Sequence, residues 1–351
     1  MTEEDESMSS DNDRNNRWSA VKALLDNAEN VILSTHMNPD GDGLGSQLAM
    51  ADYLESHGKT GTILNPSPVP EDLHFMMDYA DFRHYDRDNH NHLLARADLA
   101  IIFDIGDFGR LGYLGEDLLE CKMKTISIDH HPHKDPNGFS HVVHDVSACA
   151  TGYLVYDFLK YANGSEQTIS ETVANGLYVA LMTDTGSFRF NNTDARAHEM
   201  ASELIRSGVK PYDLYQQVYE SMPMERVKLL GTVLEDIHLS AAGRLAWFTV
   251  TREMIEDAGA SSGHVSGFTD TVRSVKGVEV AVMIHEISDN KTRLNFRSKG
   301  KVKIDDLARE FGGGGHPFAA GAVVKQSLVT TREAIIPATV SEIEEQLGEG
   351  S

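Results

Sequence analysis

The chain has 351 residues, 40% of them hydrophobic, and a formal net charge of −23 at pH 7. It is long enough for two domains with apolar cores, and no apolar stretch approaches the ~20 residues that a membrane-spanning helix needs. The acidic N-terminus does not resemble a signal peptide, and Cys121 and Cys149 have neither zinc-ligand spacing nor a disulfide framework. We therefore expect a cytoplasmic protein without a membrane partner. Residues 1–16 are polar and acidic, which predicts a disordered tail.

Strands and helices alternate over residues 17–221, which we predict to form one domain. Strands are expected near 30–35, 60–64, 98–103 and 125–128, and helices near 18–27, 43–57, 150–162, 170–182 and 194–207. This alternation predicts an α/β fold with a mainly parallel sheet that is covered by helices.

The pattern becomes helical from Pro211, and residues 222–239 are predicted to be a connecting helix and linker. A smaller α/β domain is expected over residues 240–351. Its strands are expected at 245–251, 278–287 and 292–297, and its helices at 304–311 and 331–347.

The first strand runs into the segment His36-Met37-Asn38-Pro39-Asp40-Gly41-Asp42-Gly43. One imidazole and two carboxylates lie within seven residues, and Mn²⁺ or a similar ion prefers such a mixture of nitrogen and oxygen ligands. Glycines at 41, 43 and 45 predict a tight turn that lets both aspartates converge. The alternative is an ordinary strand-to-helix turn in which the aspartates cap the helix.

Three further clusters of Asp or His follow apolar segments. Asp104 follows the strand expected near 98–103, and Asp129-His130-His131 follows the one expected near 125–128. Asp184 follows an apolar helix at 173–182. Ligands and catalytic groups gather at the carboxyl ends of the strands in an open α/β sheet. Because a buried ionised carboxylate without a partner is costly, several converging carboxylates imply bound cations.

Near the C-terminus, Gly312-Gly313-Gly314-Gly315-His316 precedes Ala319-Ala320-Gly321. With the four preceding motifs in order, this signature resembles the DHH phosphoesterase superfamily, named for its Asp-His-His triplet. The resemblance covers roughly residues 17–345, and the glycine motif resembles the substrate-binding DHHA1 domain. Length and two-domain layout resemble the NrnA-type subgroup, which degrades short RNA and dephosphorylates 3′-phosphoadenosine 5′-phosphate (pAp).

The resemblance implies a site for two divalent cations, with Mn²⁺ favoured over Mg²⁺. The implied ligands are His36, Asp40, Asp42, Asp104, His130 and Asp184. Asp104 is expected to be shared, because two metal ions about 3.5–4 Å apart need a common carboxylate and together activate water for in-line attack on phosphorus. His131 is expected to donate to the scissile phosphate. Asp129 is expected to orient a neighbouring histidine, or alternatively to cap a turn, so the expected catalytic residues are Asp104, Asp129 and His131.

The second domain is expected to bind the substrate, with the active site in the cleft between the domains. The residues implied by resemblance are Arg297, Ser298, Gly313, Gly314, Gly315 and His316. The guanidinium of Arg297 offers forked donors that suit a phosphate, and the glycine run is expected to leave backbone N–H groups free for a phosphate or a ribose. The alternative, a flexible glycine linker, is disfavoured by the apolar segment that follows.

A block of six basic residues and no acidic residue lies between Lys291 and Lys303. Such blocks are usually solvated hairpin faces, but this one lies just before the glycine motif, which favours phosphate binding. The acidity of the rest of the chain is typical of a protein that needs high solubility or that works in a salty environment. It also disfavours binding of long duplex nucleic acid.

The leading hypothesis is therefore a metal-dependent phosphoesterase that degrades short RNA oligonucleotides (nanoRNA) to mononucleotides and has pAp phosphatase activity. A close rival is a phosphodiesterase for cyclic di-AMP or its linear product pApA, which the motifs do not separate from it. An inorganic pyrophosphatase is disfavoured by the glycine motif, and a RecJ-type exonuclease by the short chain.

From a different class, the chain could be a nucleotide-binding sensor without catalytic activity. Every expected metal position holds an Asp or a His, which disfavours this alternative. The expected partners are short single-stranded RNA or small nucleotides, without a stable nucleic-acid complex, and a homodimer is left open.

Overall fold

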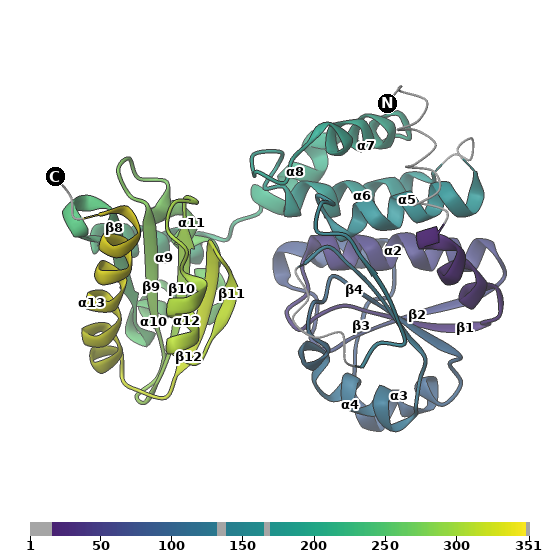
Figure 1. Cartoon of the computed structure of the whole chain (residues 1–351), viewed down its shortest axis with the longest axis horizontal. Coiled ribbons are helices and arrows are strands. Elements are labelled where there is room, and N and C mark those ends of the chain that lie inside the picture. The colour runs from purple at the N-terminus through teal and green to yellow at the C-terminus, as the bar shows by residue number, and fades with distance from the viewer. Residues whose placement is uncertain (1–15, 132–137, 165–168, 349–351) are drawn as a thin grey trace. The chain divides into compact units, whose positions relative to one another are not determined.

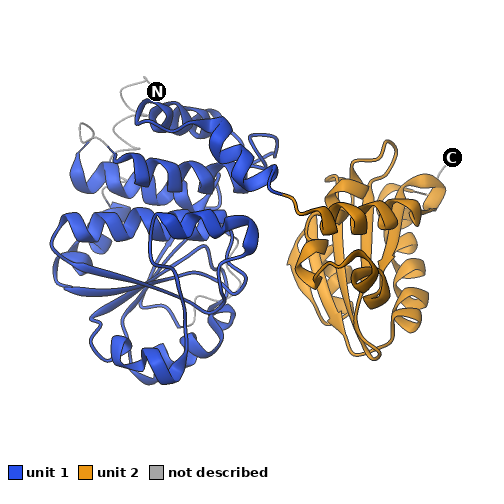
Figure 2. Ribbon diagram, turned by 180° about the vertical axis from the view of Figure 1, so that it is seen from behind, with its two compact units in different colours: residues 1–221 blue, residues 222–351 orange. Residues whose placement is uncertain are grey.

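The computed structural model describes residues 16–131, 138–164 and 169–348, and the chain forms two compact units, Met1–Ser221 and Met222–Ser351 (Figure 2). Each unit is built on its own six-stranded sheet, which confirms the expected α/β fold with a smaller second α/β unit. The expected tail at 1–16 lies, except for Asn16, outside the described residues. In the described part of the chain, no helix is long and apolar enough to cross a membrane. The cleft expected between the domains stays a prediction.

The sheet of the first unit is wholly parallel and has the strand order β3-β2-β1-β4-β5-β6. Its strands are β1 (Asn30–Ser34), β2 (Thr60–Asn65), β3 (Arg83–His84), β4 (Leu99–Phe103), β5 (Thr125–Asp129) and β6 (His141–His144). Every residue of β4 and β5 is buried, as expected for parallel strands with helices on both faces. β3 and β6 were not predicted, because β3 has only two residues and β6 is only partly buried.

Helices cover both faces of this sheet (Figure 1). On one face lies α2 (Gly41–Ser56), with α5 (Thr151–Asn163) and α6 (Glu171–Asp184) packed against it. The other face is covered by α3 (Arg87–Leu94) and α4 (Gly112–Glu120). The remaining helical segments are residues 16–26, η1 (Glu71–Asp78), η2 (Phe108–Leu111), α7 (Ala195–Arg206) and α8 (Pro211–Tyr219).

Neighbouring residues of β1 enter different apolar cores because side chains alternate between the faces of a strand. Leu33 packs in a core with Leu44 of α2, whereas Ile32 packs with Leu114 of α4 on the opposite face. The α3 helix was not predicted, because it is polar and buries only Leu94.

The second unit has a mixed sheet with the strand order β11-β12-β10-β9-β8-β7, in which only β8 and β9 pair in parallel. Its strands are β7 (His238–Ser240), β8 (Leu245–Val250), β9 (Val280–Ser288), β10 (Lys291–Ser298), β11 (Gly314–His316) and β12 (Ala319–Val324). Its helical segments are α9 (Met224–Glu235), η3 (Ala241–Gly243), α10 (Arg252–Ala258), η4 (Ser262–Val265), α11 (Phe268–Arg273), α12 (Asp305–Glu310) and α13 (Leu328–Leu347).

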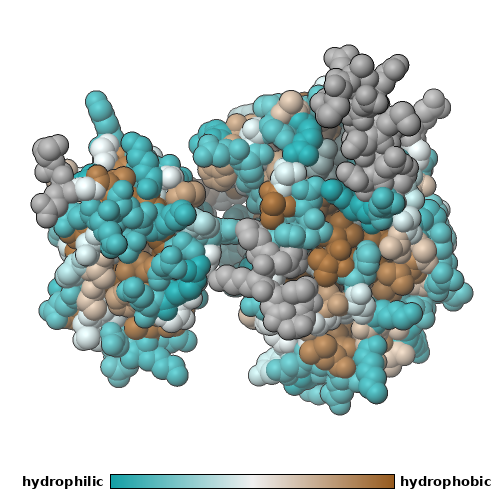
Figure 3. Space-filling view, viewed as in Figure 1, coloured by the Kyte–Doolittle hydropathy of each residue, from teal (hydrophilic) through white to brown (hydrophobic). Residues whose placement is uncertain are grey.

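Alternate residues of β9 again serve two cores. Ile284 packs in the same core as Ile335 of α13, whereas Met283 packs in a core with Phe268 of α11. The surface seen in Figure 3 is mainly hydrophilic in both units, with scattered apolar patches.

Candidate metal centre

The strand order of the first unit reverses at β1 and β4. The chain passes from β1 to β2 and β3 on one side, and then returns to place β4 beside β1. Ligands bind at the carboxyl ends of strands at such a reversal in open α/β sheets. His36 lies two residues after β1 and Asp104 directly follows β4. The backbone φ of Asp104 is 57°, a left-handed conformation that is uncommon outside glycine and concentrates at functional sites.

The first histidine, His36, faces two carboxylates. Its Nε2 lies 3.5 Å from Asp40 Oδ2 and 3.4 Å from Asp104 Oδ2. Its Nδ1 lies 2.8 Å from the backbone oxygen of Met37, and a hydrogen bond there assigns the ring proton to Nδ1. The lone pair of Nε2 is then directed at the carboxylates, as in many metal-binding histidines.

The second histidine, His130, is arranged in the same way. Its Nδ1 lies 3.1 Å from the backbone oxygen of Ala148, whereas its buried Nε2 has no hydrogen-bond partner among the described residues. This Nε2 lies 3.8 Å from Asp42 Oδ2, 3.6 Å from Asp104 Oδ1 and 3.5 Å from Asp184 Oδ2. These separations are too long for hydrogen bonds, but ligands bound about 2.0–2.2 Å from one ion lie roughly 3–3.5 Å apart. The residues therefore fit a divalent cation.

The carboxylate of Asp104 joins the two histidine groups, because Oδ2 faces His36 and Oδ1 faces His130. Three groups of side chains have ligand atoms close enough to hold an ion: His36, Asp40, Asp104; Asp42, His130, Asp184; and Asp104, His130, His131. Each of the six expected metal ligands belongs to at least one of them. The sequence motifs thus lie together in the first unit, although they are spread over 149 positions of the chain.

Burial and mutual repulsion act strongly on the carboxyl groups. Burial, followed by the charges of Asp104 and Asp184, raises the pKa of Asp42 well above its usual value. Burial also raises the pKa of Asp184, to about 7, with Asp104 adding to the effect and His130 opposing it. Negative charge therefore accumulates here only when a cation compensates it.

Carboxylates of the site also act on the pKa of the neighbouring imidazole of His36. Burial lowers the pKa of His36, but the carboxylates of Asp104 and Asp40 outweigh it and raise this pKa to about 9. Burial opposes ionisation of Asp104 too, yet the nearby imidazoles of His131 and His36 hold the pKa of its carboxyl well below the usual range.

His131 and Asp129 lie beside the expected metal ligands. His131 Nδ1 is 2.9 Å from Asp129 Oδ1 and 3.1 Å from Asp104 Oδ1. Asp129 Oδ1 also accepts the backbone N–H of His131 at 3.1 Å. The neighbouring histidine that Asp129 contacts is therefore His131.

Asp40 caps α2, which is one of the two alternatives that the sequence left open, and it also faces an expected metal ligand. Its Oδ1 accepts the backbone N–H groups of Asp42 and Gly43, both at 3.1 Å, and so caps α2. Its Oδ2 faces His36.

The reason expected for the glycines after His36 is wrong. Gly41, Gly43 and Gly45 all lie inside α2, and none has a positive φ. A Cβ at Gly43 would instead lie 2.3 Å from Thr35 Oγ1, and one at Gly45 would lie 2.1 Å from the backbone oxygen of Gly176. The glycines thus let α2 approach β1 and α6 closely.

Three supporting residues were not found from the sequence. The backbone N–H groups of Thr151 and Gly152, at the start of α5, each donate to the carboxylate of Asp42 at 2.7 Å. The hydroxyl of Thr151 also donates to Asp104 Oδ1 at 3.1 Å. Asn192 Nδ2 donates to Asp184 Oδ2 at 3.1 Å. The only sequence signals are the small residues before α5 and the Asn pair after Asp184.

The expected substrate-binding residues lie in the second unit. Arg297 of β10 and His316 of β11 both pair with Ala319 of β12, so their side chains lie on one face of the sheet, about 10 Å apart across two strand spacings. The hydroxyl of Ser298 is buried and contacts Glu279 Oε1 at 3.2 Å.

The glycine run is not an open loop. Gly313 donates its N–H to the backbone oxygen of Ala308 at 2.8 Å, and β11 pairs with β12. A Cβ at Gly313 would lie 2.0 Å from the backbone oxygen of Gly321. Close approach to β12 therefore requires glycine here.

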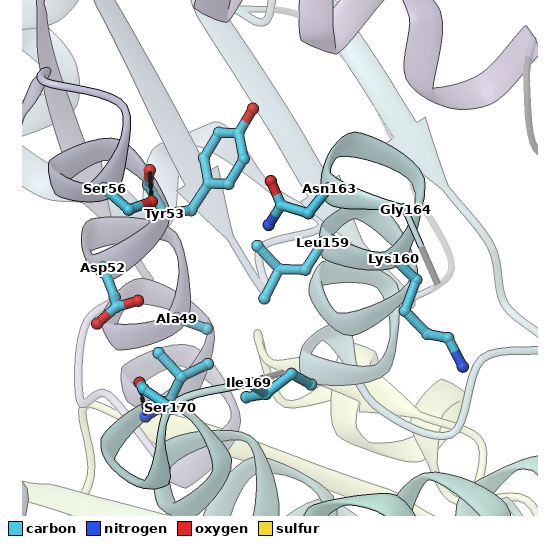
Figure 4. A pocket seen from close by; sticks show the side chains of 11 residues that line it. Ala49, Asp52, Tyr53, Ser56, Leu159, Lys160, Asn163, Gly164, Ile169 and Ser170 are labelled. Carbon is cyan, nitrogen blue, oxygen red and sulfur yellow. Dashed lines mark hydrogen bonds between the residues drawn. The ribbon is translucent and has the colours of Figure 1, made fainter. Parts of the chain in front are cut away.

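One cavity of the first unit lies away from these residues. It has a volume of about 240 Å³ and is lined by the last half of α2, with Tyr53, and by Lys160 of α5 and Ser170 (Figure 4). Tyr53 lies eleven positions after Asp42, which is roughly 16 Å along a helix. None of the expected site residues lines this cavity.

Comparisons with known proteins match this organisation. Residues 30–181 match the model of the DHH family, N-terminal domain, and residues 246–349 match that of the DHHA1 domain. Both matches confirm the resemblance seen in the motifs.

Two curated relatives are named bifunctional oligoribonuclease and PAP phosphatase NrnA. The one from Bacillus subtilis is 30% identical over 84% of this chain and 90% of its own length. The one from Thermus thermophilus is 31% identical over 84% of each chain. A crystal structure of an exopolyphosphatase-related protein from Bacteroides fragilis superposes with a TM-score of 0.88 at 25% identity, and covers 95% of this chain and 98% of that one.

Proposed function

Because the chain belongs to the DHH family and carries a DHHA1 domain, we propose that it is a metal-dependent hydrolase that degrades short RNA oligonucleotides to mononucleotides and removes the 3′-phosphate of pAp. The observation that carries this proposal is the convergence of six ligands, with the unbonded Nε2 of His130 among three carboxylates. The names of the relatives supply the substrate class.

The site depends on divalent cations, which we take to be two Mn²⁺ ions. One would be held by His36, Asp40 and Asp104, and the other by Asp42, Asp104, His130 and Asp184. When bound, such a pair supplies a water-derived nucleophile and offsets the charge that develops on the phosphoryl group. The two oxygens of Asp104 already face the two histidines, which suits a carboxylate shared by both ions.

The other groups of the first unit orient the reacting atoms. Asp129 accepts from His131 and holds its ring, and His131 then donates to a non-bridging oxygen of the scissile phosphate. Thr151 holds Asp104 in the orientation that both cation sites need.

The second unit recognises the nucleotide. Arg297 and His316 share one face of the sheet, where they bind a terminal phosphate and ribose together with Ser298, Gly313, Gly314 and Gly315. The proposal also includes a cytoplasmic location, a short single-stranded substrate and no stable nucleic-acid complex.

A side-by-side turnover assay with Mn²⁺ tests this function. Its substrates are a 5′-labelled RNA dinucleotide, a 24-mer RNA, pAp and cyclic di-AMP. Fast loss of the dinucleotide and of pAp, with the cyclic substrate intact, is the expected result. Preference for the cyclic substrate would instead place the protein in cyclic di-AMP degradation, and no turnover of any of the four would leave a nucleotide-binding sensor.

A further inference from the structure

The turn after Asp184 has an unusual backbone. Gly186, Ser187 and Phe188 have φ values of 55°, 60° and 62°, so three consecutive residues are left-handed, which is costly for residues other than glycine. Thr185 holds this conformation, because its hydroxyl accepts the N–H of Phe188 and its backbone oxygen accepts the N–H groups of the next two residues, all at 3.0 Å. Backbone strain that is maintained in this way concentrates at functional sites.

The turn directs two neighbouring aromatic side chains differently. Phe188 packs against Tyr178 and stacks on His198, with ring centroids 6.1 and 5.2 Å apart. Phe190 remains 48% exposed. Its ring covers Gly186, where a Cβ would lie 2.4 Å from it. An aliphatic side chain would cover a glycine equally well, so closing the turn does not explain an exposed aromatic ring.

In the sequence, Arg189 lies between the two aromatic residues. Arg189 Nε donates to the backbone oxygen of Gly186 at 2.6 Å, which fixes one edge of the guanidinium. Within the described residues, Arg189 forms no ion pair, although the chain carries 54 acidic residues and only 31 basic ones. The side chain of Arg189 is exposed to solvent.

Both ends of this turn lie at a metal-ligand carboxylate. The turn begins directly after Asp184, and Asn192 returns to donate to Asp184 Oδ2 and to the backbone oxygen of Cys149, at 3.1 and 2.8 Å. Phe190 and Arg189 are therefore held at the rim of the candidate metal centre.

An exposed aromatic ring and a guanidinium beside a phosphate-binding centre suit a nucleotide, because every base has a face that stacks and arginine binds phosphate oxygens. On the basis of the proposed function, we propose that Phe190 stacks on the base of the nucleotide next to the scissile phosphate and that Arg189 contacts a phosphate of that nucleotide. The site would thereby prefer nucleotide esters over other phosphate esters.

Steady-state kinetics of Phe190→Ala and Phe190→Leu test the stacking contact on an RNA dinucleotide and on two analogues that each lack one base. Both variants are expected to raise KM for the dinucleotide about tenfold, which corresponds to about 1.4 kcal/mol, with a smaller change in kcat. One of the two abasic analogues should lose this sensitivity, and Phe190→Tyr should remain close to the wild type. The exposed aromatic residue Tyr212, 62% exposed in α8, supplies the control Tyr212→Ala, which should not change KM.

Mn²⁺ affinity, measured by calorimetry, should be the same in all variants. Equilibrium binding of the dinucleotide with Ca²⁺ in place of Mn²⁺ tests the contact even without turnover. An unchanged KM and unchanged dinucleotide affinity in Phe190→Ala, with wild-type turnover present, would refute the stacking contact alone. Absence of dinucleotide cleavage by the wild type would instead refute the proposed function.

Discussion

The carboxylate of Asp42 accepts a 2.7 Å hydrogen bond from the backbone N–H of Gly152. A Cβ at Gly152 would lie 3.2 Å from Asp42 Oδ1 and 2.5 Å from the Cβ of Ala180, so position 152 has no room for a side chain. A helix N-terminus suits a carboxylate, because its free N–H groups donate and its dipole is positive there.

We therefore predict that Gly152→Ala destabilises the protein by about 1–3 kcal/mol through overpacking and weakens Mn²⁺ binding by displacing Asp42. Gly231→Ala in α9 is the matched control, because nothing lies within 4 Å of its added Cβ. It should stabilise the protein by about 0.5–1 kcal/mol, as expected in a helix. Denaturant unfolding and Mn²⁺ calorimetry measure both effects, and equal stability of the two variants would contradict the packing argument.

Asp104→Asn should remove hydrolysis and weaken both cation sites, because one carboxylate faces both histidines. We expect turnover to fall by at least about a thousandfold, since a neutral amide cannot replace a shared anionic ligand. Asp117→Asn is the control: Asp117 is also buried, but it contacts Tyr85 and Arg87. Retained turnover in Asp104→Asn would exclude Asp104 as the shared ligand.

Mn²⁺ should stabilise the first unit specifically. A ligand that binds only the folded state at 100 times its Kd adds about 2.7 kcal/mol, and the buried carboxylates repel one another without a cation. The two tryptophans make this measurable, because Trp18 lies in the core of the first unit and Trp247 lies in β8 of the second. In a Trp247→Phe variant, fluorescence reports the unfolding of the first unit through Trp18, and its Tm should rise when Mn²⁺ is added. In a Trp18→Phe variant, fluorescence reports the unfolding of the second unit through Trp247, and its Tm should not change.

Arg297→Ala and His316→Ala should raise KM for the dinucleotide several-fold and leave Mn²⁺ affinity unchanged. The two side chains share one sheet face in the second unit, whereas all six expected metal ligands lie in the first. Lys325→Ala, a change to an exposed lysine just after β12, is the control for loss of one positive charge. A KM equal to that of the wild type in both variants would remove these residues from substrate binding.

The second unit should lose stability in mild acid because of His285. This residue of β9 is fully buried, and within the part of the chain that the structure describes neither ring nitrogen has a hydrogen-bond partner. Burial, with the charge of Arg293 adding to it, lowers the pKa of His285 from 6.5 to about 4. Between these two values the unfolded chain binds a proton that the folded chain does not, so stability falls as the pH drops through this range.

His285→Leu should remove this contribution. In a Trp18→Phe background, where Trp247 reports on the second unit, the unfolding free energy of the His285→Leu variant relative to the parent should increase steadily from pH 7 to pH 4.5. A difference that does not depend on pH would show that His285 does not titrate as described.

The predictable parts of the chain are those where one physical cause dominates. β4 and β5 are buried on both faces and so form continuous apolar runs that end at Asp104 and at the Asp-His-His triplet. The contacts of Thr151 and Gly152 were not predictable, because they use backbone N–H groups that every non-proline residue carries and span 109 and 110 positions. The glycines of α2 were recognised, but for the wrong reason, since the crossing of α2 with α6 exists only in the folded chain.

The tautomers of His36 and His130 are both set by main-chain oxygens, those of Met37 and Ala148. Any amino acid at position 37 or 148 carries a backbone oxygen, so no substitution there removes the hydrogen-bond acceptor. A histidine held by a carboxylate side chain, in contrast, loses its orientation through a single missense mutation. The ring orientation of these two expected metal ligands therefore does not depend on which side chains stand at positions 37 and 148, and substitutions there should be tolerated as long as the local backbone is preserved.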